Sequence, residues 1–304
     1  MPINIPQDLP AFAELTRENV FVMASERAEK QDIRPLKVAI VNLMPTTVTT
    51  EIQLLRLLGN TPLQVDITLL RMDSHEAHNA PPGHLDRFYT NLGMIKQESF
   101  DGLIVTGAPV ETLPFEEVDY WDELCELLEY SKKHVWSALH ICWGAQAGLY
   151  YHYGIPKIPL PGKLFGIFSH NVNEKLTPLF RGFDDIFLAP QSRHTESDRN
   201  AITACGELSV QSQTPCGSPF IVTARDCREI YINGHLEYDP LTLDSEYRRD
   251  KAKGLAINVP QNYYRNDDPS QAPVVRWRAH AYLFFSNWLN YVYQETPYDL
   301  NELA

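Results

Sequence analysis

The spacing of hydrophobic residues changes period several times along the first half of the chain. Continuous apolar runs predict buried strands at 36–43, 63–71, 100–105 and 135–139. Apolar residues at helical spacing predict helices at 50–58, 83–97 and 115–132. Regular alternation of strands and helices predicts an α/β fold with a mostly parallel sheet covered by helices on both faces.

The second half of the chain has a different pattern, in which short apolar runs alternate with Pro and Gly turns. Residues 155–240 are expected to be rich in strands, and 220–224 and 229–233 are expected to pair around Asp226. A last helix is predicted at about 275–294, where aromatic and aliphatic residues recur at helical spacing and indicate packing against the core.

The first 35 residues are polar and show no sustained period. We expect them to form a loop-rich arm that packs on the domain or on a second subunit. The predicted organisation is therefore an N-terminal arm at 1–35 and a single catalytic domain at 36–304.

Composition excludes several classes of function. The net charge of −13 over 304 residues argues against nucleic acid or an anionic membrane as a partner. The N-terminus lacks a basic stretch followed by an apolar one, so no signal peptide and a cytoplasmic location are expected. The five cysteines contain no C-x-x-C pair, so neither a disulfide framework nor a metal site is expected.

One cysteine stands at the junction between a predicted strand and a helix start. Cys142 follows the apolar run 135–139, and small residues at 145–150 begin the helix. A sharp strand-to-helix turn exposes a nucleophile at the carboxyl end of a sheet. The positive end of the helix favours a thiolate, and in such positions the thiol pKa falls from ~8.5 to roughly 3.5–7.5. Gly144 allows this turn to close without a side-chain clash.

A candidate base follows another predicted strand, 229–233. His235 and Glu237 are two residues apart, so in an extended segment they lie on the same face. Glu237 can then orient His235 and raise its basicity, which is what a cysteine nucleophile requires of its base.

Acyl transfer also requires backbone N–H groups for the oxyanion. We expect one from Trp143, which directly follows Cys142, and one from Ala108 in the turn after strand 100–105. A lone cysteine or histidine is usually structural, but the three pieces each follow a strand of one α/β pattern. Together they favour a catalytic site at the carboxyl edge of the sheet.

These same segments carry a resemblance to a known family. TGAP at 106–109, ICWGAQ at 141–146 and HLE at 235–237 resemble the signatures of the class I glutamine amidotransferase fold. More narrowly, the chain resembles the homoserine O-acyltransferases of bacterial methionine biosynthesis. The likeness runs nearly end to end and includes the segments 42–45, 50–60, 62–65, 115–121 and 284–290.

The resemblance implies a ping-pong acyl transfer in which Cys142 holds the acyl group and His235 activates the hydroxyl of L-homoserine. It implies acyl-CoA as a co-substrate, no bound cofactor, and a homodimer. It also implies substrate-binding roles for Lys163, Ser192 and Arg249. An arginine fork suits the carboxylate of homoserine.

Glu111 is the position that the resemblance links to the acyl donor. In the family, glycine at this position accompanies succinyl transfer and glutamate accompanies acetyl transfer. A glutamate side chain would fill the space beyond an acetyl group and would repel the distal carboxylate of succinyl. The sequence thus favours homoserine O-acetyltransferase, with acetyl-CoA as donor.

Three other functions remain open from the sequence. A homoserine O-succinyltransferase would differ only in the donor pocket, and a glutaminase subunit would use the same triad on an amide. A non-catalytic binding protein on the same fold is the third, although the complete set of Cys142, His235 and Glu237 argues against it.

Overall fold

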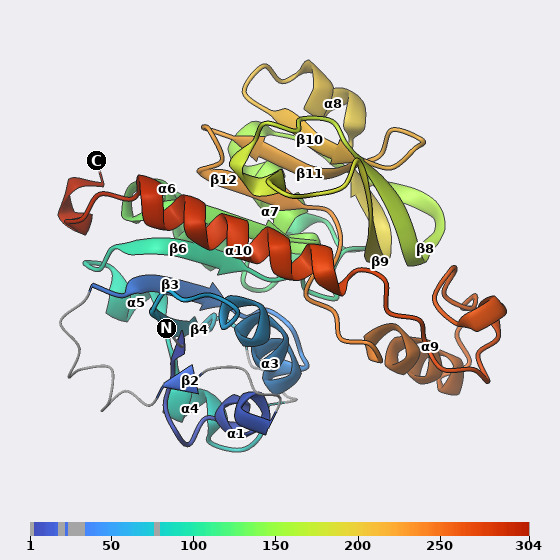
Figure 1. Cartoon of the computed structure of the whole chain (residues 1–304), viewed down its shortest axis with the longest axis horizontal. Coiled ribbons are helices and arrows are strands. Elements are labelled where there is room, and N and C mark those ends of the chain that lie inside the picture. The colour runs from blue at the N-terminus through green and yellow to red at the C-terminus, as the bar shows by residue number, and fades with distance from the viewer. Residues whose placement is uncertain (1–2, 18–21, 24–33, 76–79, 304) are drawn as a thin grey trace.

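The computed structural model describes residues 3–17, 22–23, 34–75 and 80–303, and within them one long sheet runs through the molecule with helices on both faces (Figure 1). Its main strand order is β2-β1-β4-β3-β6-β7-β12-β11-β10-β8-β9, and β5 pairs with β4 outside that path. The strands are β1 (Ile3–Asn4), β2 (Val22–Met23), β3 (Leu36–Val41), β4 (Val65–Leu70), β5 (Tyr89–Thr90), β6 (Phe100–Val105), β7 (Val135–Ile141), β8 (Lys157–Val172), β9 (Ile186–Ser197), β10 (Ser209–Gln213), β11 (Pro219–Ala224) and β12 (Glu229–Ile232).

The sheet has a parallel half and an antiparallel half. The strands from β2 to β12 in that order are parallel, whereas β11, β10, β8 and β9 each run antiparallel to their neighbours. All six residues of β6 are buried, as expected for a central strand covered on both faces. The predicted α/β class is therefore confirmed, and the strand-rich second half forms the antiparallel extension.

Two layers of helices cover the sheet, one on each face. α3 (Thr47–Leu58) and α10 (Arg278–Glu295) share a core cluster with α1 (Pro10–Arg17), whereas α6 (Trp121–His134) belongs to a separate cluster with Trp143. The remaining helices are α4 (His84–Phe88), α5 (Leu92–Ile95), α7 (Trp143–Tyr153), α8 (Arg199–Ala204) and α9 (Thr242–Ala252), with short 3₁₀ turns at Phe115–Glu117, Pro178–Phe180, Arg265–Asp267 and Leu300–Glu302. Within the described part of the chain, no helix is both long enough and apolar enough to cross a bilayer.

The prediction of a single helix at 83–97 is wrong. The structure has α4, the short strand β5 and α5 instead. Tyr89 is buried in an extended conformation beside β4, and Asn91 caps α5 by accepting a hydrogen bond from the Met94 N–H. A buried strand residue and a new N-cap outweigh the helical period here.

Two further expectations need adjustment. The helix expected at 115–132 divides into a 3₁₀ turn and α6, which starts at Trp121. In the N-terminal arm, the described residues include β1, which pairs with β4, and α1, which buries Ala11 and Leu15 against the core. The described part of the arm thus packs on the domain, as one of the two expected alternatives, but through a strand and a helix rather than mainly through loops, while 1–2, 18–21 and 24–33 lie outside the described residues.

Candidate active site

The carboxyl ends of β6, β7 and β12 bring the predicted nucleophile, base and oxyanion turn to one edge of the sheet. Cys142 lies between β7 and α7 and has φ 51° and ψ −112°. Positive φ is unusual for a residue with a side chain and marks the sharp turn that the sequence predicted. The Cys142 N–H donates to Ile232 O at 2.7 Å, so β12 holds the elbow from the other side.

Gly144 is required by a close backbone approach. A Cβ atom at this position would lie 2.6 Å from Thr106 O and 2.9 Å from Val105 O, which is too close for any side chain. The elbow helix therefore packs directly on the end of β6.

The turn after β6 faces both Cys142 and His235. A Cβ atom added at Gly107 would lie 3.3 Å from Cys142 Cβ and 3.6 Å from His235 Cε1. Ala108, next in this turn, is buried, and so is Trp143, the first residue of α7. That the backbone N–H groups of Ala108 and Trp143 bind the oxyanion stays a prediction. Both residues lie in segments that adjoin the predicted nucleophile.

The structure brings Glu237 and Cys142 together around His235. His235 Nδ1 lies 2.7 Å from Glu237 Oε1, and both side chains are buried. Burial alone lowers the pKa of His235, but the negative charges of Cys142 and Glu237 and hydrogen bonds to both raise that pKa well above its ordinary value. The arrangement favours the protonated imidazolium of His235.

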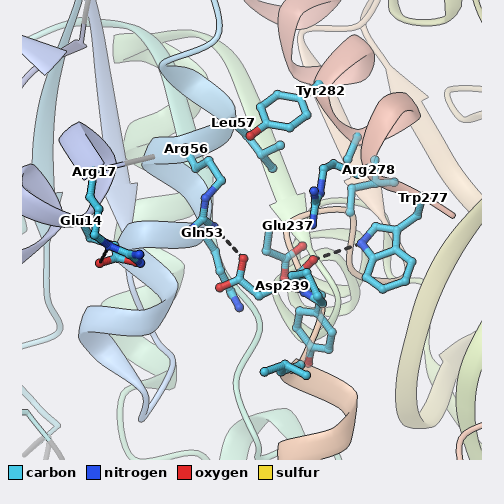
Figure 2. Close-up of a pocket in the computed structure, with 15 residues that line it drawn as sticks. Glu14, Arg17, Gln53, Arg56, Leu57, Glu237, Asp239, Trp277, Arg278 and Tyr282 are labelled. Carbon is cyan, nitrogen blue, oxygen red and sulfur yellow. Dashed lines mark hydrogen bonds and ion pairs between the residues drawn. The ribbon is translucent and has the colours of Figure 1, made fainter. Parts of the chain in front are cut away.

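The loop that carries Glu237 is held from two helices (Figure 2). Asp239 forms an ion pair with Arg56 of α3 at 2.6 Å, and Trp277, directly before α10, donates from Nε1 to Tyr238 O at 3.0 Å. Glu237 also lines a cavity of about 690 Å³ between these elements. The charged residues that line this cavity are three acids and three arginines, namely Glu14, Glu237, Asp239, Arg17, Arg56 and Arg278.

The three predicted substrate-binding residues gather around acidic residues of α9. Lys163 Nζ lies 3.3 Å from Glu246 Oε2 and 3.6 Å from Asp250 Oδ2. Ser192 Oγ donates to Glu246 Oε2 at 2.5 Å. Arg249 Nε donates to Asp250 Oδ1 at 2.7 Å, and its side chain is 54% exposed. The structure thus forms one polar site from β8, β9 and α9.

Sequence reasoning missed Glu246 and Tyr238. Tyr238 stacks on His235 and donates from its hydroxyl to Glu246 Oε1 at 2.8 Å, so it joins the triad to the polar site. The polar run of α9 shows no clear apolar period, and no helix was predicted there. Had the helix been recognised, the three-residue spacing of Glu246 and Arg249 would have placed both on one face.

The Glu111 side chain turns inward. Its Oε2 atom is buried and has no hydrogen-bond partner. Burial lowers the pKa of the Arg193 guanidinium, and the charges of Glu196, Cys142 and Glu111 partly offset that effect. Glu111 and Cys142 thus both lie within electrostatic range of the buried Arg193.

Comparison with known proteins finds relatives over nearly the whole chain. The family model described as homoserine O-succinyltransferase matches residues 2–298. A Brevibacillus brevis protein named homoserine O-acetyltransferase is 58% identical over 302 residues, which cover 99% of each chain. An Acetivibrio thermocellus protein of the same name is 56% identical over 304 residues, which cover both chains completely.

Solved structures extend the comparison to the fold. A glutamine amidotransferase from Thermotoga maritima superposes with a TM-score of 0.57 at 12% identity, covering 86% of this chain and 99% of that one. The predicted class I glutamine amidotransferase-like fold is confirmed by this likeness.

Proposed function

This chain belongs to the homoserine O-succinyltransferase family, and from that premise we propose that it transfers an acetyl group from acetyl-CoA to the hydroxyl of L-homoserine. The observation that carries the reaction type is the set of Cys142, His235 and Glu237 at the carboxyl edge of the sheet. The observation that favours acetyl is the inward-facing Glu111.

In the first half-reaction, the Cys142 thiolate attacks the thioester carbonyl of acetyl-CoA. The bond between that carbonyl carbon and the CoA sulfur breaks as the new thioester to Cys142 forms. The imidazolium of His235 gives its proton to the departing CoA thiolate. Thioester exchange is close to isoenergetic, so the acetyl-enzyme is a reasonable intermediate.

In the second half-reaction, neutral His235 accepts the proton of the homoserine hydroxyl. The alkoxide oxygen attacks the acetyl carbon, the bond to Cys142 Sγ breaks, and the thiolate returns. Glu237 holds the Nδ1 side of the ring throughout, so Nε2 is the atom that faces the reaction. The N–H groups of Trp143 and Ala108 would stabilise the oxyanion in both steps.

The acceptor would bind in the polar site around α9. Homoserine carries a carboxylate, for which the exposed fork of Arg249 and the cation of Lys163 are suitable partners. It also carries an ammonium, for which the Glu246 carboxylate is the matching charge. Ser192, which donates to Glu246, would adjust the fit of this end.

The proposed donor is tested by measuring CoA release with homoserine and either acetyl-CoA or succinyl-CoA. We expect kcat/KM to be at least about tenfold higher for acetyl-CoA, because a buried like charge is costly. Preference for succinyl-CoA would overturn the donor assignment and retain the family. Glutamine hydrolysis without homoserine acylation would instead support a glutaminase.

Replacing Arg249 with alanine is expected to raise KM for homoserine by about tenfold, since a charge-assisted contact to the carboxylate is lost. CoA release in the absence of homoserine, which reports the first half-reaction, should stay at the wild-type rate. Arg248→Ala is the matched control, because Arg248 lies on the same helix and pairs with Asp244. Equal KM values in the two variants would contradict the role of Arg249.

A further inference from the structure

Tyr238 touches two parts of the site that otherwise belong to different steps of the reaction. Its ring stacks on His235 with centroids 4.0 Å apart and planes inclined by 16°. Its hydroxyl donates to Glu246 Oε1 at 2.8 Å. The same side chain therefore contacts the base and the carboxylate that faces the acceptor site.

The stacked ring favours the charged form of the base. An imidazolium over the face of an aromatic ring is stabilised by the ring quadrupole, and more strongly when both are desolvated. His235 and Tyr238 are both buried. In the proposed first half-reaction, protonated His235 is the proton donor to the departing CoA thiolate, so the ring stabilises the form of the base that this step requires.

The hydroxyl fixes the orientation of Glu246. Burial together with the charges of Glu246, Glu237 and Cys142 raises the pKa of Tyr238, so its hydroxyl remains a donor. Glu246 uses Oε1 for this bond and Oε2 for Ser192 and Lys163. The Tyr238 hydroxyl thus holds one oxygen and turns the other toward the acceptor residues.

The backbone of Tyr238 is held independently of these two contacts. Trp277 donates to its carbonyl oxygen, and the neighbouring Asp239 is paired with Arg56 (Figure 2). Removing the hydroxyl should therefore leave the ring in place, which makes the two contacts separable by mutation.

We propose that Tyr238 is a positioning residue that couples the acceptor site to the general base, its hydroxyl orienting Glu246 for homoserine and its ring supporting protonated His235. This inference rests on the proposed function and assigns the two contacts to different half-reactions. The hydroxyl acts when homoserine binds, and the ring acts when Cys142 is acylated.

Tyr238→Phe tests the hydroxyl. We expect KM for homoserine to rise about tenfold, the scale of a hydrogen bond to a charged group. CoA release without homoserine should stay within twofold of wild type, because the ring still stacks on His235. Tyr264→Phe is the matched control, since Tyr264 is a buried tyrosine that donates to Asp244 of the same helix, and its KM should not change.

Tyr238→Leu tests the ring. The rate of CoA release without homoserine should fall about threefold or more, and its alkaline limb should move to lower pH by about half a unit, because the imidazolium loses its stacking partner. The charged groups that act on His235 are Cys142 and Glu237, while Glu246 acts on Tyr238, and Arg193 is within electrostatic range of Cys142 and Glu111. All of them remain in both variants, so the limb should stay in place in Tyr238→Phe.

The outcomes separate this inference from the function on which it rests. A wild-type protein that does not acetylate homoserine would remove the proposed function. An active wild type whose KM for homoserine is the same in Tyr238→Phe and Tyr264→Phe would overturn the role of the hydroxyl. Identical pH profiles in Tyr238→Phe and Tyr238→Leu would overturn the role of the ring.

Discussion

Replacing Cys142 with alanine is expected to lower homoserine acetylation by roughly 10⁴-fold or more, since the covalent route is lost with the sulfur. In the proposed route Cys142 is the residue that takes the acetyl group, and it lies at the elbow beside the buried His235. Incubation with acetyl-CoA alone should add one acetyl group to the wild-type protein, as seen by intact mass, and nothing to the variant.

The exposed Cys216 provides the matched control. Cys216→Ala should keep both the acetyl adduct and the overall rate, because this residue lies in the turn between β10 and β11 and not at the strand ends that carry Cys142 and His235. A Cys142→Ala protein that acetylates homoserine at the wild-type rate would end the proposed route. An adduct that persists in Cys142→Ala would place the acetyl group on another residue.

The sequence was sufficient to predict the strands whose side chains are buried on both faces of the sheet. β6 is buried at every position, so its apolar run could only be a central strand. The prediction of one helix at 83–97 was wrong because contacts to residues distant in sequence hold Tyr89 at the edge of the sheet. One of these residues is Glu51, to which the Tyr89 hydroxyl donates at 2.7 Å. Local period carries no information about such a tertiary partner.

The same distinction applies to the site. The elbow at Cys142 and the pair of His235 and Glu237 are local features, so motif and spacing were enough to predict where they lie. The link through Tyr238 to Glu246 joins a loop to a helix that was not recognised, and it exists only after α9 packs beside the loop. Positioning residues of this kind depend on packing, which one sequence does not display.

Replacing Glu111 with glycine is expected to shift the donor preference toward succinyl-CoA by about a hundredfold, measured as the ratio of the two kcat/KM values. The substitution removes both the side chain that occupies the space beyond the acetyl group and its negative charge. Lys157 and Arg193, on which the Glu111 charge acts, would each lose one acidic neighbour and would be freer to attract the distal carboxylate of succinyl, although Glu116 and Glu196 remain beside them. Attraction would replace repulsion at this end of the pocket.

Two further variants separate the causes. Glu111→Gln keeps the size and removes the charge, so a shift nearly as large as that of glycine would assign the preference to repulsion, and no shift would assign it to space. Glu117→Ala removes an exposed acid of the nearby 3₁₀ turn and should leave the ratio unchanged. If Glu111→Gly also leaves the ratio unchanged, Glu111 does not line the acyl pocket, and donor choice must then come from other residues around Cys142.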